Sequence, residues 1–308
     1  MKVFYHNDMD GIVSAQIILD FMTNVESKEC KEEDFIKMDY TKKFPLDKIK
    51  EKEEIYIVDY SIDPAEMKQL LELTPRVVWI DHHISAIEKY KNSDLDYEAI
   101  HGLRANGIAG CVLTYWYFYG RMSETDEFIA SYPKNLESRF RKLIPMYIKL
   151  AGDWDVWEHL YQEDTKKFTI CFSTMINSPF DKVQFDKIKT EDGLNDFYSY
   201  GALLLDYRTS WAKEFMARYG FETQIEGHSA FVANLGNANS EYFGDLINKY
   251  DIIGTFCFNG EKWTISLYSN KDYINCAEIC ARNGGGGHKG AAGYVTDKIS
   301  FKKEEKNV

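Results

Sequence analysis

The sequence predicts an α/β protein in which an N-terminal doubly wound parallel sheet is joined by a long helix to a smaller α+β domain. Three observations predict it. In the first half, short apolar runs alternate with helix-period patterns, as in a parallel sheet. The second half is dominated by strand patterns. A chain of 308 residues is long enough for two cores. We expect domains at 1–190 and 221–308, with the linker helix at 191–220.

The first half contains four expected strands. Continuous rather than alternating hydrophobicity in Ile55–Val58 and Val77–Ile80 is typical of strands buried on both faces. A run from Val3 and a shorter one at Phe35–Tyr40 complete the set. The helices expected in this half are 12–22, 64–73, 107–119 and 136–150.

The second half is expected to begin after the long amphipathic helix 192–219. Its expected strands are 222–225, 230–232, 252–258 and 263–268, and its expected helices are 241–250 and 274–281.

Composition limits the range of functions. The net charge of −12 disfavours a long electrostatic track on duplex nucleic acid, although bound divalent metals would reverse the sign locally. The six cysteines form no Cys-x-x-Cys pair, so we interpret them as reduced thiols of a cytoplasmic protein. The sequence contains no apolar run of membrane-spanning length and no signal-peptide pattern, and we expect no membrane partner.

Acidic residues and histidines follow three of the expected strands. His6, Asp8 and Asp10 come after the first, Asp59 after Ile55–Val58, and Asp81-His82-His83 after Val77–Ile80. The carboxyl ends of parallel strands meet at one edge of a sheet, where ligands of doubly wound folds bind. Carboxylates mixed with imidazoles suit divalent cations such as Mn²⁺. The alternative for the first segment alone is a solvated turn whose aspartate caps the next helix.

A further carboxylate is expected near Gly152-Asp153-Trp154-Asp155. Asp153 follows an expected helix end and is a candidate metal ligand, and Asp155 is a second candidate that the sequence barely separates from the first.

The run Arg282-Asn283-Gly284-Gly285-Gly286-Gly287-His288-Lys289 is expected to hold a phosphate. Glycines that precede a helix let the backbone approach an anion, and the helix N-terminus favours negative charge. The alternative is a flexible linker. Because His288 and Lys289 follow at once, together with small residues that could begin a helix, we favour the phosphate site.

These motifs resemble those of the DHH phosphoesterases with a C-terminal DHH-associated domain. The resemblance is carried by His6-x-Asp8-x-Asp10-Gly11, Asp59, Asp81-His82-His83 and Gly-Gly-Gly-Gly-His288. The form of the first motif is most similar to the oligoribonuclease (nanoRNase) and cyclic-nucleotide phosphodiesterase branch. The resemblance implies that 1–190 is the catalytic DHH domain and that 221–308 is the DHH-associated, substrate-binding domain.

The resemblance also implies a site with two Mn²⁺ ions, with Mg²⁺ as the alternative. One ion would be held by His6, Asp8 and Asp59, and the other by Asp10, Asp59, His82 and Asp153. His83 would face the scissile phosphate, and Asp81 would orient a neighbouring histidine. The substrate would contact Arg282, the glycines Gly285, Gly286 and Gly287, and His288.

The expected activity is hydrolysis of short single-stranded RNA oligonucleotides or other small nucleotide phosphodiesters to nucleoside monophosphates. Two metal ions can activate water directly, so no covalent nucleophile is required. The alternatives are a pyrophosphatase or exopolyphosphatase of the same superfamily and a catalytically silent nucleotide-binding module. The sequence leaves open the substrate length, the role of cyclic nucleotides and whether the protein forms a homodimer.

Overall fold

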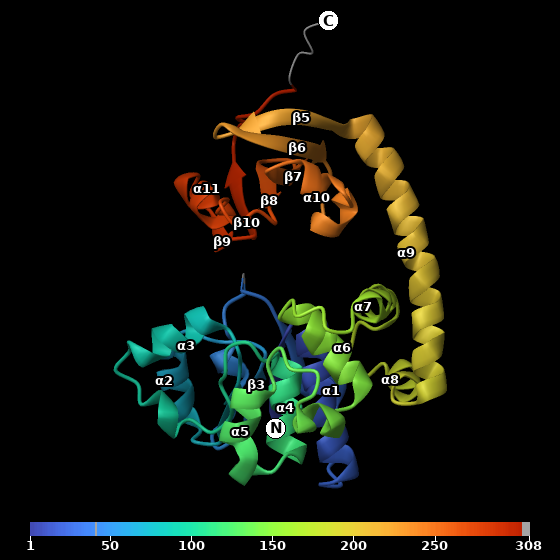
Figure 1. Cartoon of the computed structure of the whole chain (residues 1–308). Coiled ribbons are helices and arrows are strands. Elements are labelled where there is room, and N and C mark those ends of the chain that lie inside the picture. Colours follow the sequence, from blue (N-terminus) through green and yellow to red (C-terminus); the bar gives the residue numbers. More distant parts are fainter. Residues whose placement is uncertain (41, 304–308) are drawn as a thin grey trace, which may run out of the picture. The chain divides into compact units, whose positions relative to one another are not determined.

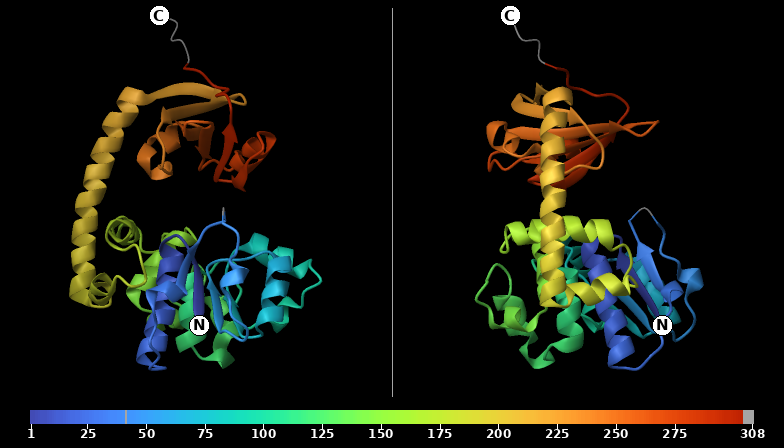
Figure 2. Two further views of the ribbon diagram at one scale, coloured as in Figure 1. Left: turned by 180° about the vertical axis from the view of Figure 1, so that it is seen from behind. Right: turned by 90° about the vertical axis from the view of Figure 1, so that its right-hand side faces the viewer.

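The chain folds into two compact units, Met1–Leu204 and Leu205–Val308, in a computed structural model that describes residues 1–40 and 42–303 (Figure 1). Helix α9 (Glu191–Tyr219) is one continuous helix that carries the chain from the first unit into the second (Figure 2).

The first unit is built on a four-stranded parallel sheet. Its strands are β1 (Lys2–His6), β2 (Phe35–Met38), β3 (Ile55–Val58) and β4 (Val77–Ile80), in the order β2-β1-β3-β4. From β1 the chain adds β2 on one side and β3 on the other, so the strand order reverses between β1 and β3. The α/β class expected from the sequence is confirmed.

Both faces of this sheet are buried, which explains the continuous hydrophobic runs. Tyr56 and Val58 of β3 belong to one apolar cluster, whereas Ile55 and Ile57 belong to a second cluster. Figure 1 shows α2 (Pro64–Leu73) and α3 (Ile84–Lys91) on one side of the sheet and α1 (Met9–Asn24) and α4 (Gly110–Tyr119) on the other.

The remaining helices of the first unit lie C-terminal to α4. They are α5 (Thr125–Ser131), α6 (Met146–Asp155), α7 (Glu163–Met175) and α8 (Lys182–Ile188). The single helix expected at 136–150 is wrong. The chain forms a 3₁₀ segment at Arg139–Leu143, and α6 begins only after Pro145. Ile144 is extended, with φ −98° and ψ 130°, as expected of a residue that precedes proline.

The second unit contains a six-stranded mixed sheet. Its strands, in the order β5-β6-β7-β8-β10-β9, are β5 (Gly220–Ile225), β6 (His228–Asn234), β7 (Ile252–Phe258), β8 (Trp263–Tyr268), β10 (Ala291–Thr296) and β9 (Gly286–His288). Helix α11 (Cys276–Arg282) packs with the core of one face. The other face packs with the C-terminal part of α9 and the short α10 (Leu246–Lys249).

Two expectations for this unit are wrong. The helix expected at 241–250 is broken into a 3₁₀ turn, Ser240–Phe243, and α10, because Gly244 adopts a positive φ of 50° between them. The segment after the glycine run does not begin a helix. It forms the hairpin of β9 and β10, in which Gly287 pairs with Ala292.

All six cysteines are free thiols, in agreement with the expectation of no disulfide framework. Across the described residues, the helices are all too short or too polar to cross a membrane.

Candidate metal centre

The acidic residues and histidines predicted from the strand ends gather where the strand order reverses. His6 is the last residue of β1, and Asp59 follows β3 directly. In doubly wound folds this crevice, outside the carboxyl ends of the strands, is the usual ligand site. The structure therefore brings together residues more than fifty positions apart, as the strand pattern predicted.

The first group consists of His6, Asp8 and Asp59, whose candidate ligand atoms lie within 4.8 Å of one another. His6 Nδ1 is 2.5 Å from Asp8 Oδ2 and 3.8 Å from Asp59 Oδ2. Asp8 also caps α1, because its Oδ1 accepts a hydrogen bond of 2.9 Å from the N–H of Gly11. The capping alternative is thus true of Asp8, but only one of its two oxygens is used for it.

The second group consists of Asp10, His82 and Asp155, and it too lies within 4.8 Å. His82 Nε2 is 3.7 Å from Asp10 Oδ2 and 3.2 Å from Asp155 Oδ2. The same nitrogen is 3.2 Å from Asp59 Oδ1, so Asp59 contacts both groups. Burial lowers the pKa of His82, which favours the neutral imidazole that binds metals.

Asp59 is the most constrained residue of the centre. It is 1% exposed, it adopts a left-handed φ of 50°, and both carboxylate oxygens lack a hydrogen-bond partner among the described residues. Burial, together with the charges of Asp10, Asp8 and Asp155, raises its pKa well above the usual range. A buried carboxylate without a partner is costly unless something else compensates it, and a cation would do so.

Asp81 and His83 are a hydrogen-bonded pair that, with Asp59 and His82, forms a third group of candidate ligand atoms within 4.8 Å of one another. Asp81 is fully buried and accepts backbone hydrogen bonds from His82 and His83, at 2.8 and 3.3 Å, and a third from the hydroxyl of Ser61. Its Oδ1 lies 2.7 Å from Nδ1 of His83. Burial lowers the pKa of His83, but the contact with Asp81 outweighs it and the net pKa is raised. Asp81 thus orients His83 and favours its protonated form.

Asp153 does not join the metal centre, which corrects the expected ligand set. Its carboxylate accepts hydrogen bonds from the N–H groups of Leu160 and Tyr161, at 2.7 and 3.3 Å, and from the hydroxyl of Thr165. These bonds hold the loop between α6 and α7. Asp155, the other candidate left open by the sequence, occupies the metal centre instead. The two side chains point apart because successive helical residues are rotated by about 100°, so residues two apart face opposite sides.

Sequence reasoning missed the role of Gly110 at the N-terminus of α4. The N–H groups of Gly110 and Cys111 each donate a 2.7 Å hydrogen bond to the carboxylate of Asp10. A Cβ at Gly110 would lie 2.7 Å from Cβ of Asp59 and 3.0 Å from Oδ2 of Asp10. The only sequence signal was a glycine among small residues at a helix start, a pattern that ordinary helix packing also produces.

The C-terminal glycine run is placed in the second unit, where its geometry differs from position to position. Gly287 has a φ of 142°, and a Cβ there would lie 2.6 Å from Cα of Ala292. A Cβ at Gly285 would lie within 3 Å of Tyr294, whereas one at Gly286 would meet nothing within 4 Å. Two of these glycines therefore serve the hairpin itself.

The other two expected substrate contacts have different surroundings. Arg282 forms a two-pronged ion pair with Glu226, with Nε 3.2 Å from Oε1. The side chain of His288, on the edge strand β9, is exposed.

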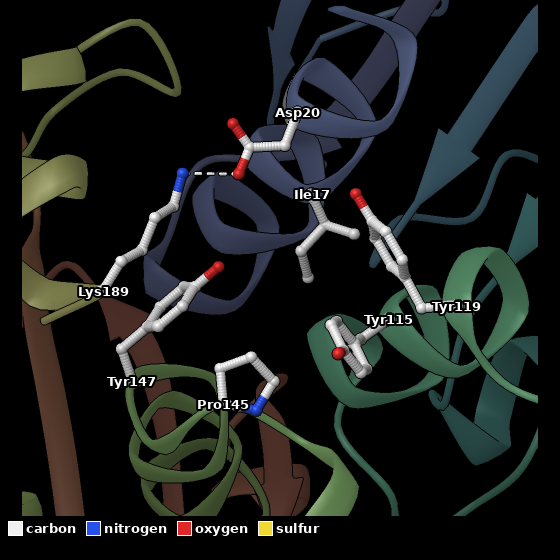
Figure 3. Close-up of a pocket in the computed structure, with 7 residues that line it drawn as sticks. All are labelled: Ile17, Asp20, Tyr115, Tyr119, Pro145, Tyr147 and Lys189. Atoms are coloured by element: carbon white, nitrogen blue, oxygen red, sulfur yellow. Dashed lines mark hydrogen bonds and ion pairs between the residues drawn. The ribbon is translucent and has the colours of Figure 1, made fainter. Parts of the chain in front are cut away.

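A separate pocket of about 200 Å³ lies in the first unit (Figure 3). The Lys189–Asp20 ion pair, 2.5 Å long, lies on one side of it, and Ile17 points into it. It is lined by Ile17, Asp20, Tyr115, Tyr119, Pro145, Tyr147 and Lys189. None of the residues of the metal centre contributes to it.

The donor set of the metal centre fits divalent cations. The two groups offer two imidazoles and four carboxylates. Besides the oxygens of Asp59, two further buried atoms lack hydrogen-bond partners among the described residues: Oδ2 of Asp155 and Nε2 of His82. Carboxylate-rich coordination suits Mn²⁺ or Mg²⁺. Covalent catalysis by the nearest thiol is disfavoured, because burial raises the pKa of Cys111 well above its usual range.

Comparisons with known proteins support the resemblance to the DHH family. Residues 1–136 match the DHH family, N-terminal domain. Oligoribonuclease NrnB of Bacillus subtilis is 23% identical over 316 residues, an alignment that covers 96% of this chain and 73% of the relative. The family resemblance inferred from the motifs is therefore confirmed.

Solved structures align with this chain at low sequence identity. The DHH domain of PF0399, a member of a family of ribosomal proteins, has a TM-score of 0.53 at 12% identity, covering 96% of this chain and 82% of that chain. The pGpG-specific phosphodiesterase PggH from Vibrio cholerae has a TM-score of 0.45 at 14% identity, covering 96% and 92%.

Proposed function

We propose that this chain is a DHH phosphoesterase whose metal centre, with two Mn²⁺ ions, hydrolyses short RNA oligonucleotides and dinucleotides to nucleoside monophosphates. The observation that carries the proposal is Asp59, a buried carboxylate without hydrogen-bond partners among the described residues that contacts both ligand groups. A left-handed backbone at a non-glycine residue is a strained conformation of the kind that clusters at functional sites.

We assign the ligands from these contacts. His6, Asp8 and Asp59 would hold one ion, and Asp10, Asp59, His82 and Asp155 would hold the other, with Asp155 in place of Asp153. When bound, the ions supply a water of lowered pKa and neutralise charge on the phosphate oxygens.

His83 is the residue we assign to the scissile phosphate. Because Asp81 holds its Nδ1, the opposite ring nitrogen is the one left for substrate, and the raised pKa of His83 favours the proton-donating form. A protonated imidazole can donate a charge-assisted hydrogen bond to a phosphate oxygen and release its proton toward the leaving oxygen.

The substrate class is supported by the name of the Bacillus subtilis relative, an oligoribonuclease, and by charge. A net charge of −12 disfavours long nucleic acids, which need many cationic contacts. We assign the second unit, with the exposed His288 and the open face at Gly286, to binding a phosphate of the substrate. Arg282 forms an ion pair with Glu226, so it contacts that phosphate only if the substrate displaces Glu226.

The test is a panel of 5′-labelled di- to decanucleotides, a cyclic dinucleotide and pyrophosphate, run with Mn²⁺ and with EDTA. We expect Mn²⁺-dependent turnover, with kcat/KM falling steeply from dinucleotides to chains of about ten nucleotides. Pyrophosphate turnover without nucleotide cleavage would instead establish the pyrophosphatase alternative.

A matched pair of variants tests the metal assignment. Asp59→Asn should abolish turnover while it keeps the left-handed backbone, which asparagine tolerates well. Asp20→Asn removes only the Lys189 ion pair, a partly exposed contact of little energy, and should stay active. Full activity in Asp59→Asn would refute the assignment.

A further inference from the structure

Tyr40 is an exposed aromatic residue at the edge of the metal centre. Its ring centroid lies 5.5 Å from that of His6, a proposed metal ligand, and 6.2 Å from that of His83, the residue assigned to the scissile phosphate. It follows the edge strand β2, whose last residue is Met38. No acid or histidine motif marks it in the sequence.

One face of the Tyr40 ring is already occupied. Tyr60, which is 3% exposed and follows Asp59 in the chain, stacks on it with centroids 4.9 Å apart and an interplanar angle of 29°. Tyr40 itself is nevertheless 57% exposed. A stack with only one covered face leaves a second, apolar face directed away from Tyr60.

Stacking on the buried Tyr60 favours this orientation of the Tyr40 ring. A ring that is already positioned loses less conformational entropy when a second ring stacks on it. Stacking on a positioned aromatic side chain is the usual way in which proteins hold single-stranded bases, and it tolerates all four bases.

We propose that Tyr40 is the platform on which a nucleobase adjacent to the scissile phosphate stacks. This inference rests on the proposed function, and it adds a recognition element for the base to a centre that otherwise binds only phosphate. The ring centroids of Tyr40 and His83 are 6.2 Å apart, a separation that the sugar between a base and its own phosphate can span.

Trp157 is the competing platform, since it is 52% exposed and lies two residues after Asp155. Its ring contacts are with Trp154 and His159, at 5.0 and 4.3 Å. Tyr40, by contrast, contacts two residues of the site itself, so we assign the base to Tyr40.

Tyr40 could instead act only as a shield that excludes water from His6 and His83. The two roles predict different results. A shield affects every substrate equally, whereas a stacking platform affects only substrates that carry the base.

The experiment uses the diadenosine substrate pApA and two analogues in which one or the other adenine is replaced by hydrogen. Tyr40→Ala should lower kcat/KM for pApA by about fivefold to over a hundredfold, the cost of losing one stacked base. It should leave unchanged the analogue that lacks the stacked base. Tyr40→Phe should keep most of the activity, because the ring is retained.

Tyr200→Ala is the matched control, since Tyr200 is 53% exposed in the same unit but belongs to α9. It should behave as the wild type on all three substrates. Trp157→Ala should change kcat/KM by the same factor, if at all, for pApA and for both analogues.

Equal losses on pApA and both analogues in Tyr40→Ala would overturn the stacking role and leave the shield. The affinity for AMP, measured by calorimetry, distinguishes a failure of the stacking role from a failure of the proposed hydrolase function. If the wild type cleaves none of the three substrates, the proposed function fails. Tyr40 then remains a base platform only if Tyr40→Ala weakens AMP binding by at least fivefold, and unchanged binding refutes it.

Discussion

The placement of Asp155, rather than Asp153, in the metal centre predicts that two neighbouring substitutions change stability in opposite directions. Ligand oxygens of Asp10 and Asp155 lie within 4.8 Å of each other. At an effective dielectric constant of about 20, two charges at this distance repel by about 3.5 kcal/mol. Burial and the neighbouring acids raise the pKa of Asp155, and partial protonation relieves part of that repulsion.

We therefore expect Asp155→Asn to stabilise the metal-free first unit by roughly 1–2 kcal/mol, which for a unit of this size raises Tm by roughly 2–8 °C. The same change should weaken Mn²⁺ binding. If affinity falls tenfold to a hundredfold, the stabilisation at a Mn²⁺ concentration 100 times the wild-type Kd drops from about 2.7 to between about 0.4 and 1.4 kcal/mol.

Asp153→Asn should give the reverse pattern. It replaces an acceptor of three hydrogen bonds with an amide that presents an N–H₂ to one of the donors. The cost is about 1–3 kcal/mol in the presence or absence of metal. The increase in Tm on adding Mn²⁺ should remain at the wild-type value.

Differential scanning calorimetry in EDTA and in Mn²⁺ measures all four quantities. If Asp155→Asn lowers the metal-free Tm and keeps the Mn²⁺ effect, while Asp153→Asn abolishes that effect, the two aspartates have been assigned the wrong way round. Both variants must behave as expected, because placing Asp155 and not Asp153 in the metal centre predicts changes of opposite sign in the metal-free Tm.

Three further predictions follow from the same contacts. Gly110→Ala should abolish both turnover and the Mn²⁺-induced rise in Tm, because the added Cβ would displace Asp59; equilibrium dialysis with Mn²⁺ measures the loss directly. Gly287→Ala should destabilise the second unit by about 1–3 kcal/mol, because Gly287 has a positive φ. Gly286→Ala should change the free energy of unfolding of this unit by under about 1 kcal/mol, because a Cβ at Gly286 would meet nothing within 4 Å. Urea titrations measure both changes. In EDTA, the contribution of Asp59 and Asp155 to the free energy of unfolding should fall as pH rises above the usual aspartate pKa, because carboxyls with a raised pKa bind more protons in the folded state. Asp155→Asn should flatten this slope, and an unchanged slope would contradict the raised pKa values.

The strand ends were predictable because the signal is local. Each parallel strand carries its own hydrophobic run, and the residue after it must lie at the carboxyl edge of the sheet whatever the rest of the chain does. His6, Asp59 and His82 could therefore be placed together before any tertiary contact was known.

The choice between Asp153 and Asp155 was not local in this way. It depends on how α6 is rotated about its axis, and that rotation is fixed by apolar residues such as Ile148 and Leu150 packing against the first core. Asp155 is the last residue of α6, where the helix dipole disfavours an anion. That disadvantage is itself typical of a residue retained for function.

The glycine run illustrates a different limit. Consecutive glycines indicate that the backbone needs unusual freedom, but not which structure uses it. Here the need arises from the hairpin, since Gly287 has a positive φ and the backbone at Gly285 passes close to Tyr294. Only the pairing of Gly287 with Ala292, five residues further along the chain, separates a hairpin from a phosphate loop at a helix start.

The carboxylates of the metal centre divide according to what already satisfies them. Asp10 receives two N–H groups from the start of α4, Asp81 receives two N–H groups and a hydroxyl, and one oxygen of Asp8 caps α1. These contacts fix the acids in place without neutralising the whole cluster. Asp59 and Asp155 retain buried oxygens that the described protein groups do not satisfy, and both have a raised pKa. The fold thus anchors Asp8, Asp10 and Asp81 with its own donors and leaves Asp59 and Asp155 without them, which explains why the metal-free unit should gain stability when Asp155 is neutralised.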